Sequence, residues 1–115
     1  MNYNNKSEIL KRANFLLKDG VKNRESMFHT PIISSFSHQH ISSRVMVLRA
    51  HSATQRIMRF HSDFRSDKVK EMLDDPRTSI IAYDPALKTQ IRLVGKSKIH
   101  HNLSLIHISE PTRLV

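Results

Sequence analysis

The alternation of hydrophobic and polar positions predicts a small, mainly β protein with flanking helices. Near the N-terminus, apolar positions repeat with the i, i+4, i+7, i+8 spacing of an amphipathic helix, which we expect over residues 7–24. Asp19-Gly20 is expected to weaken this helix or end it early. Its predicted apolar stripe consists of Ile9, Leu10, Ala13, Leu16, Leu17 and Val21.

Short runs rich in Val, Ile, Met, Leu and Phe then predict five strands, separated by polar turns. We expect them at residues 31–36, 41–50, 55–61, 78–83 and 89–99, with Gly95 as a candidate bulge or close approach. A short helix is expected at 66–75, with Val69, Met72 and Leu73 buried and Pro76 ending it. The close spacing of the strands favours antiparallel pairing in a small barrel or sandwich.

A basic stretch crosses the centre of this pattern. Its cations are Arg44, Arg49, Arg56, Arg59, Arg65 and Lys68. The last two fall at the start of the second predicted helix, where free amides and partial positive charge favour an anion. Cations at such a place indicate a phosphate site. From the pattern alone, a solvated basic helix start is an equally open reading.

Composition narrows the class of protein and its partners. The 115 residues are enough for one domain, and no cysteine is present for disulfides or thiolate chemistry. The net charge of +9 favours anionic partners, which could be nucleic acid, phosphorylated metabolites or an acidic surface. No apolar run suggests a signal peptide or a membrane span, so a cytoplasmic location is expected.

Eight histidines raise the question of a metal site, but no Cys or carboxylate completes a set at ligand spacing. We therefore expect no bound metal. Asp74 and Asp75 precede a proline and are typical of a turn rather than of a catalytic carboxylate pair. No Gly-rich phosphate loop, nucleophile elbow or HExxH motif is present.

The last residues differ from the rest of the chain. The string LSLIHISEPTR, residues 103–113, matches one reading frame of a common transposase-type sequencing-library adapter. We therefore expect residues 103–115 to be a non-native tail, with a genuine C-terminal tail as the alternative. No function is argued from His107, Glu110 or Arg113.

Four segments together resemble a known family. They are FHTPIISSF, SRVMVLRA, MRFHSDFRSDKVKEML and DDPRTSIIAYDPALKTQIRLVGKSKI, and they cover most of residues 27–99. The chain resembles the pyridoxamine 5'-phosphate oxidase-like, FMN-binding split-barrel family. The resemblance implies a six-stranded split barrel with flanking helices and a homodimer with FMN in the cleft between the copies. Residues 1–102 would form the N-terminal part of a single such domain, incomplete at its C-terminus.

The resemblance also implies roles for particular residues. The strand Arg44, Val45, Met46, Val47, Leu48 and Arg49 would run along the flavin, with Arg44 near its phosphate. Arg49 stands where family oxidases have Lys. His61 and Ser62 match a pair of which the hydroxyl helps hold the phosphate, Lys68 matches the phosphate-binding Lys, and Gln90 matches a Gln brought to the flavin of the dimer. Family oxidases typically have Arg immediately before this Lys, where the present chain has Asp67. Arg65, two positions earlier, is the candidate to supply the missing positive charge.

One geometric point bears on this assignment. Arg44 and Arg49 are five positions apart, so on a regular strand they would face opposite sides. Both can serve one cleft only through a bulge, a strand end or the partner subunit. Catalytic residues stay unassigned, because the family's substrate-binding segments follow the part that matches here.

The expected function is that of an FMN-dependent oxidoreductase acting on a small-molecule substrate. The alternative is a small basic nucleic-acid-binding domain. With 6% aromatic residues and no Trp, the chain offers few surfaces for base stacking, so nucleic acid is the less favoured partner. A flavin carrier without catalysis is a third possibility.

Overall fold

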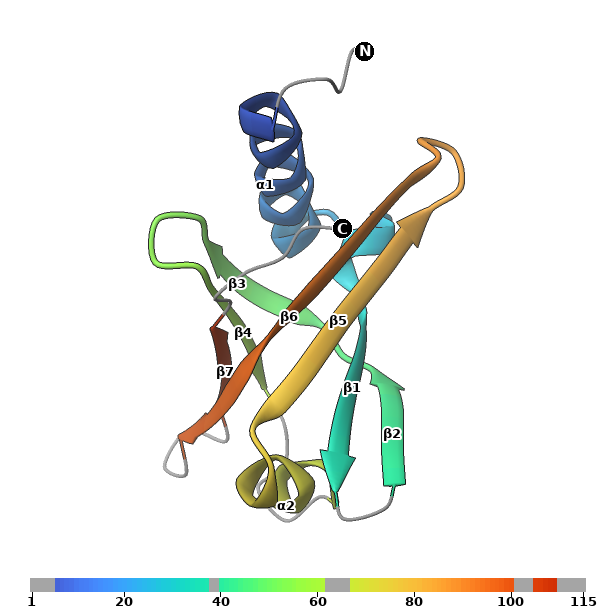
Figure 1. Ribbon diagram of the computed structural model, residues 1–115. Helices are drawn as coiled ribbons and strands as arrows, with labels where there is room; N and C mark the ends of the chain where they lie inside the picture. The colour runs from blue at the N-terminus through green and yellow to red at the C-terminus, as the bar shows by residue number, and fades with distance from the viewer. Residues whose placement is uncertain (1–5, 38–39, 62–66, 101–104, 110–115) are drawn as a thin grey trace.

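The computed structural model describes residues 6–37, 40–61, 67–100 and 105–109, which form two α-helices, one 3-10 helix and seven strands (Figure 1). The elements are α1 (Lys6–Lys22), η1 (Met27–His29), β1 (Ile32–Ser37), β2 (His40–Val45), β3 (Leu48–Ser52), β4 (Ile57–His61), α2 (Asp67–Asp74), β5 (Arg77–Asp84), β6 (Thr89–His100) and β7 (Leu105–Ser109).

All seven strands belong to one antiparallel sheet with the order β2-β1-β5-β6-β7-β4-β3. The two edge strands, β2 and β3, follow one another in the chain and are joined by only Met46 and Val47. Such a short link requires the two edges to lie close together, so the sheet curls round without closing. This arrangement is a split barrel and confirms the predicted fold class.

The prediction of a single strand over residues 41–50 is wrong, because this segment forms two separate strands, β2 and β3. Residues 40–45 pair with β1, and residues 48–52 pair with β4 at the other edge of the sheet. Between them Met46 is buried, and its backbone N–H donates to the carbonyl oxygen of Pro31 at 3.1 Å. The sequence shows no sign of this break, since the apolar run at residues 45–48 continues from the end of β2 through the link into β3.

A β-bulge occurs in β3 and not at Gly95. Gly95 pairs with Thr78 in unbroken register, so the bulge prediction there is wrong. In β3, Leu48 pairs with Phe60 and Ala50 with Arg59, which leaves Arg49 as the extra residue. The bulge shifts the alternation of side chains, so that His51 faces the same side as its cross-strand neighbour Met58.

The core lies inside the curled sheet, and the two helices contact it at opposite ends (Figure 1). α1 packs on η1 and β3, and α2 packs on β1 and β6. Buried core residues include Leu16, Leu17 and Ile33, together with Phe60 and Met72. A larger set shares this environment: Ala13, Phe28, Met46, Leu48, Met58, Val69, Ile80, Ala82, Ile91, Leu93 and Ile108.

Both helices lie close to their predicted ranges, with two errors on their buried faces. Leu10 of α1 and Leu73 of α2 are about half exposed, at 48% and 50%, although both were expected in the core. Each lies at the margin of its apolar stripe, and the sheet does not extend that far. α1 also continues past Gly20, which is buried against Phe28 of η1.

Within the described residues, no helix is both long enough and apolar enough to cross a membrane.

Candidate functional site

The most connected polar group in the described structure links β1, β2 and α2. Arg44 lies near the end of β2, and its side chain faces inward because its cross-strand partner Ile33 does. Its Nη1 donates to the Ser35 hydroxyl at 2.8 Å and to the Ile33 carbonyl oxygen at 3.4 Å. Its Nη2 forms an ion pair with Glu71 of α2 at 3.1 Å.

Glu71 accepts hydrogen bonds on both carboxylate oxygens. The hydroxyl of Ser35 donates to Oε2 at 2.9 Å, and that of Ser42 donates to Oε1 at 3.1 Å. Burial raises the pKa of the Glu71 carboxyl, but the hydrogen bonds from Ser35 and Ser42 and the charge of Arg44 lower it. The net effect is a pKa below the ordinary value, so Glu71 is ionised near neutral pH.

These four residues form a closed unit, which we call the Arg44–Glu71 cluster (Arg44, Glu71, Ser35 and Ser42). Ser35 is 2% exposed and bridges the two charged groups, because it accepts from Arg44 and donates to Glu71. The unit ties α2 to the two neighbouring strands. It therefore fixes the start of α2 relative to Arg44.

The predicted phosphate site is described in part. Lys68 is the second residue of α2, one turn before Glu71, so its backbone lies in the helix that the cluster holds. Its side chain lies outside the described part of the structure. Ser62 and Arg65 are also outside the described residues.

The strand predicted to run along the flavin has mixed environments. Val45 is exposed on the outer face of the sheet, Met46 and Leu48 are buried, and Val47 is half-buried. Arg49 is exposed at the bulge of β3. Because the segment is broken at Met46 and Val47 and bulged at Arg49, regular strand alternation no longer requires Arg44 and Arg49 to face opposite sides. The two arginines lie on the edge strands at either side of the split.

His61 and Gln90 are both exposed, and Gln90 lies away from the Arg44–Glu71 cluster. His61 is the last residue of β4, while Gln90 lies near the start of β6 opposite Tyr83. The cross-strand row that contains Arg44 reaches β6 at Leu93, which is three positions along the strand from Gln90. β6 is also three strands away from β2 in the sheet. This corresponds to about 10 Å along the strands and about 14 Å across them. Within one copy, the structure does not bring Gln90 to the Arg44–Glu71 cluster.

Sequence reasoning missed Glu71, Ser35 and Ser42. Ser42 lies two positions before Arg44, and strand alternation places such residues on one face. Glu71 lies three positions after Lys68, which places it on an adjacent side of the same helix. These spacings were available, but nothing in them shows that α2 packs beside β1 and β2.

The cluster suits recognition of an anion next to a helix start. A guanidinium has five N–H donors, and three contacts of Arg44 go to Ile33, Ser35 and Glu71. Two donors therefore have no partner among the described residues. Arginine donors beside helix N-terminal amides and a lysine make a site typical of phosphate groups.

Comparison with known proteins decides the family. The model of the pyridoxamine 5'-phosphate oxidase FMN-binding domain matches residues 13–101, from α1 to the end of β6. The chain belongs to this family. A search of curated proteins found no significant match.

Solved structures of other proteins share the fold at low sequence identity. A Listeria innocua protein assigned as a pyridoxamine 5'-phosphate oxidase has a TM-score of 0.73 at 13% identity, over 93% of this chain and 98% of that one. A Clostridium acetobutylicum protein related to general stress protein 26 has a TM-score of 0.71 at 9% identity, over 91% and 85%. PhzG from Burkholderia lata, solved with tetrahydrophenazine-1-carboxylic acid, has a TM-score of 0.64 at 21% identity, over 84% and 46%.

Proposed function

We propose that this chain binds FMN through a basic phosphate site and functions as part of an FMN-dependent oxidoreductase. The observation that carries the proposal is the inward-facing guanidinium of Arg44, held beside α2 by Glu71 and Ser35. Membership of an FMN-binding family supports the choice of anion. When bound, FMN would supply two-electron transfer between a small-molecule substrate and an acceptor.

The residues present fit a flavin phosphate. Such a group needs several charge-assisted hydrogen bonds, and Arg44 retains two N–H donors without a described partner. Lys68 and the first amides of α2 lie on the helix that the cluster holds. We assign Arg44 and Lys68 to the phosphate, and we propose Ser62, Arg65 and His61 as further contacts. The role of this set is to bind and orient the cofactor.

A comparison of FMN with riboflavin tests this assignment, because the two differ only in the phosphate. The unmodified chain should bind FMN at least about tenfold more tightly than riboflavin, on the scale of charge-assisted hydrogen bonds. Lys68→Ala should remove most of that difference without weakening riboflavin. Lys70→Ala is the matched control, since Lys70 is an exposed residue of the same helix. Equal affinities for FMN and riboflavin in the unmodified chain would refute the phosphate site.

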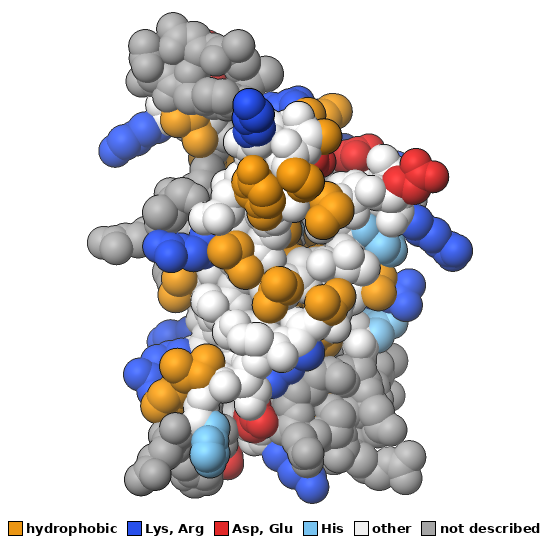
Figure 2. Space-filling view, turned by 90° about the vertical axis from the view of Figure 1, so that its right-hand side faces the viewer, with side chains coloured by type: hydrophobic (Ala, Val, Ile, Leu, Met, Phe, Trp, Pro, Cys, Tyr) orange, Lys and Arg blue, Asp and Glu red, His pale blue; other side chains and the backbone are white. Residues whose placement is uncertain are grey.

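We further propose a homodimer that uses the outer face of β2, β1, β5 and β6. The register places Val45, Ile32 and Ile81 in one row on this face, with Ile41 and Phe36 in another. Val45, Ile32 and Ile41 are 61%, 42% and 73% exposed, which is a large apolar surface for a single copy. Figure 2 shows hydrophobic side chains gathered in the middle of the side on which β1 and β2 lie.

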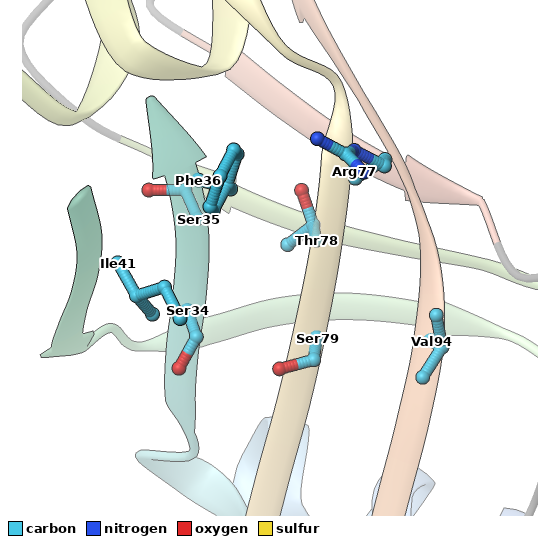
Figure 3. A pocket seen from close by; sticks show the side chains of 8 residues that line it. All are labelled: Ser34, Ser35, Phe36, Ile41, Arg77, Thr78, Ser79 and Val94. Atoms are coloured by element: carbon cyan, nitrogen blue, oxygen red, sulfur yellow. The ribbon is translucent and has the colours of Figure 1, made fainter. Parts of the chain in front are cut away.

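A hollow of about 240 Å³ lies between these rows (Figure 3). Ser34 and Ser79 form its floor on adjacent strands, and they lie between Ile41 on one side and Val94 on the other. Small residues flanked by bulky ones leave room for an apolar side chain from a facing surface. The occupant we propose is a second copy, as the family resemblance implies, and Gln90 on this face would then approach the partner's flavin.

The alternative is binding of nucleic acid by the basic residues of β6. Arg92, Lys96 and Lys98 alternate along the outer face of this strand and are all exposed. Tight DNA binding that weakens steeply with salt, in a chain that retains no flavin, would favour this alternative.

The cytoplasmic location and the division of the chain at residue 102 stay proposals. Both rest on the sequence alone, the second on the adapter-like string. β7 lies within that string, between β4 and β6, and its Ile108 is buried.

A further inference from the structure

We propose that Glu71 is a positioning residue of the phosphate site, which holds the guanidinium of Arg44 in the orientation that accepts the phosphate of FMN. This inference rests on the proposed function. It assigns a role to an acidic residue in a site that otherwise needs positive charge.

The hydrogen bonds around Glu71 form a closed ring. Arg44 Nη1 donates to Ser35 Oγ, which donates to Glu71 Oε2, and this same oxygen accepts from Arg44 Nη2. Two different nitrogens of the guanidinium are thus bound to two different groups. Because a guanidinium is planar, two such anchors fix its plane.

The ring also determines which donors remain for a ligand. Both N–H groups of Nη1 have acceptors, at Ile33 and Ser35, and one of Nη2 is used by Glu71. The Nε–H and the second N–H of Nη2 have no acceptor among the described residues. These two donors lie on one edge of the guanidinium and match a bidentate contact with an oxyanion.

Glu71 is itself held on its other side by α2 and β2. Ser42 donates to Oε1, and the helix that carries Glu71 also carries Lys68. Glu71 therefore sets the position of Arg44 relative to the start of α2. Without it, a long arginine side chain would have to be ordered each time the ligand binds, which lowers affinity.

A competing role for Glu71 makes the opposite prediction. If its carboxylate merely occupied Arg44 in place of phosphate, removing its charge would free the guanidinium and strengthen FMN binding. The sign of the change in FMN affinity therefore separates a positioning residue from a competitor.

The experiment measures dissociation constants for FMN and riboflavin by quenching of flavin fluorescence, in the unmodified chain and in Glu71→Gln. We expect the preference for FMN over riboflavin to fall about tenfold in Glu71→Gln, with riboflavin affinity unchanged. Ser42→Ala removes one support and keeps the ion pair, so it should lower the preference by about threefold. Asp75→Asn is the control, since it removes an exposed ion pair with Arg77 next to α2 without touching Arg44.

The outcomes separate the inference from the proposed function. An unmodified chain that binds FMN no better than riboflavin refutes the phosphate site, and the role of Glu71 with it. An unmodified chain that prefers FMN, with Glu71→Gln keeping or increasing that preference, overturns the positioning role alone. If Glu71→Gln fails to fold, as judged by its thermal transition, Ser42→Ala decides the question, and an unchanged preference there also overturns the role.

Discussion

At the scale of single residues, the main finding is an acidic residue inside a basic site. Arg44 was expected near a phosphate, and the structure shows it bound to Glu71 and Ser35. A partly buried arginine without such partners would leave donors unsatisfied at a substantial cost. The carboxylate satisfies part of the guanidinium and leaves the rest for a ligand.

Glu71 should also make the stability of the fold depend on pH. Its pKa in the folded state lies below the ordinary value near 4.5, so the unfolded chain takes up its proton first as the pH falls. The stabilisation is present above that value and is lost as the pH falls through the folded pKa. Glu71→Gln should lower the free energy of unfolding by about 1–3 kcal/mol near neutral pH.

Urea unfolding from about pH 7 to about pH 3 measures this effect. The difference between the unmodified chain and Glu71→Gln should shrink below about pH 4.5, because the protonated carboxyl loses its ion pair with Arg44. A difference that stays constant over the whole range would show that the charge of Glu71 contributes nothing.

Residue roles were the least predictable part of the site. Arg44 and Lys68 were assigned from a family pattern, and the residues that support Arg44 were not identified. Ser35 lies 36 positions before Glu71, and no local pattern reports a contact over that distance. Such partners depend on how α2 packs, which is a property of the tertiary structure.

At the scale of elements, the helices and most of the strands were predicted from periodicity. The error at residues 41–50 has a clear cause, because β2 and β3 are both strands and their link is buried in the core. Hydrophobic alternation identifies strands but not their partners. The bulge at Arg49 is likewise set by pairing with β4 and leaves no mark in the sequence.

Gly20 provides a test of how α1 meets η1. A Cβ at this position would lie 2.8 Å from the backbone carbon and oxygen of Phe28, so the two elements would have to move apart. Gly20→Ala should therefore lower the free energy of unfolding by about 1–3 kcal/mol, despite the higher helix propensity of Ala.

Chemical denaturation compares this variant with Lys18→Ala, an exposed position of the same helix. The control should stay within about 0.5 kcal/mol of the unmodified chain. Gly20→Ala with equal or greater stability would mean that the close approach of α1 and η1 is wrong.

At the scale of the whole molecule, the split barrel explains why a single copy has an apolar outer face. The sheet curls round one core, so its convex side between β2 and β6 has no covering helix among the described elements. Exposed Val45 and Ile41 belong to this side. The order of strands and helices limited the fold to a small antiparallel barrel or sandwich, and the resemblance to the family selected the split barrel.

A charge on the outer face should separate the proposed dimer. Val45→Glu would place a carboxylate at the β2 end of the apolar row of Val45, Ile32 and Ile81, where a second copy would have to desolvate it. Sedimentation velocity should show a dimer for the unmodified chain and a monomer for Val45→Glu.

Leu10→Glu is the matched control, because Leu10 is also about half exposed but lies on α1. This variant should remain dimeric. A monomeric unmodified chain, or a dimer that Val45→Glu leaves intact, would contradict the proposed interface.

The most direct test of the account is whether the purified chain retains FMN. The chain is mixed with FMN, free ligand is removed by gel filtration, and the visible absorption spectrum is recorded beside the circular dichroism of the same sample. We predict flavin bands that elute with folded protein, and a much weaker signal when riboflavin replaces FMN. A folded, colourless protein would contradict the central claim that this split barrel binds a flavin phosphate.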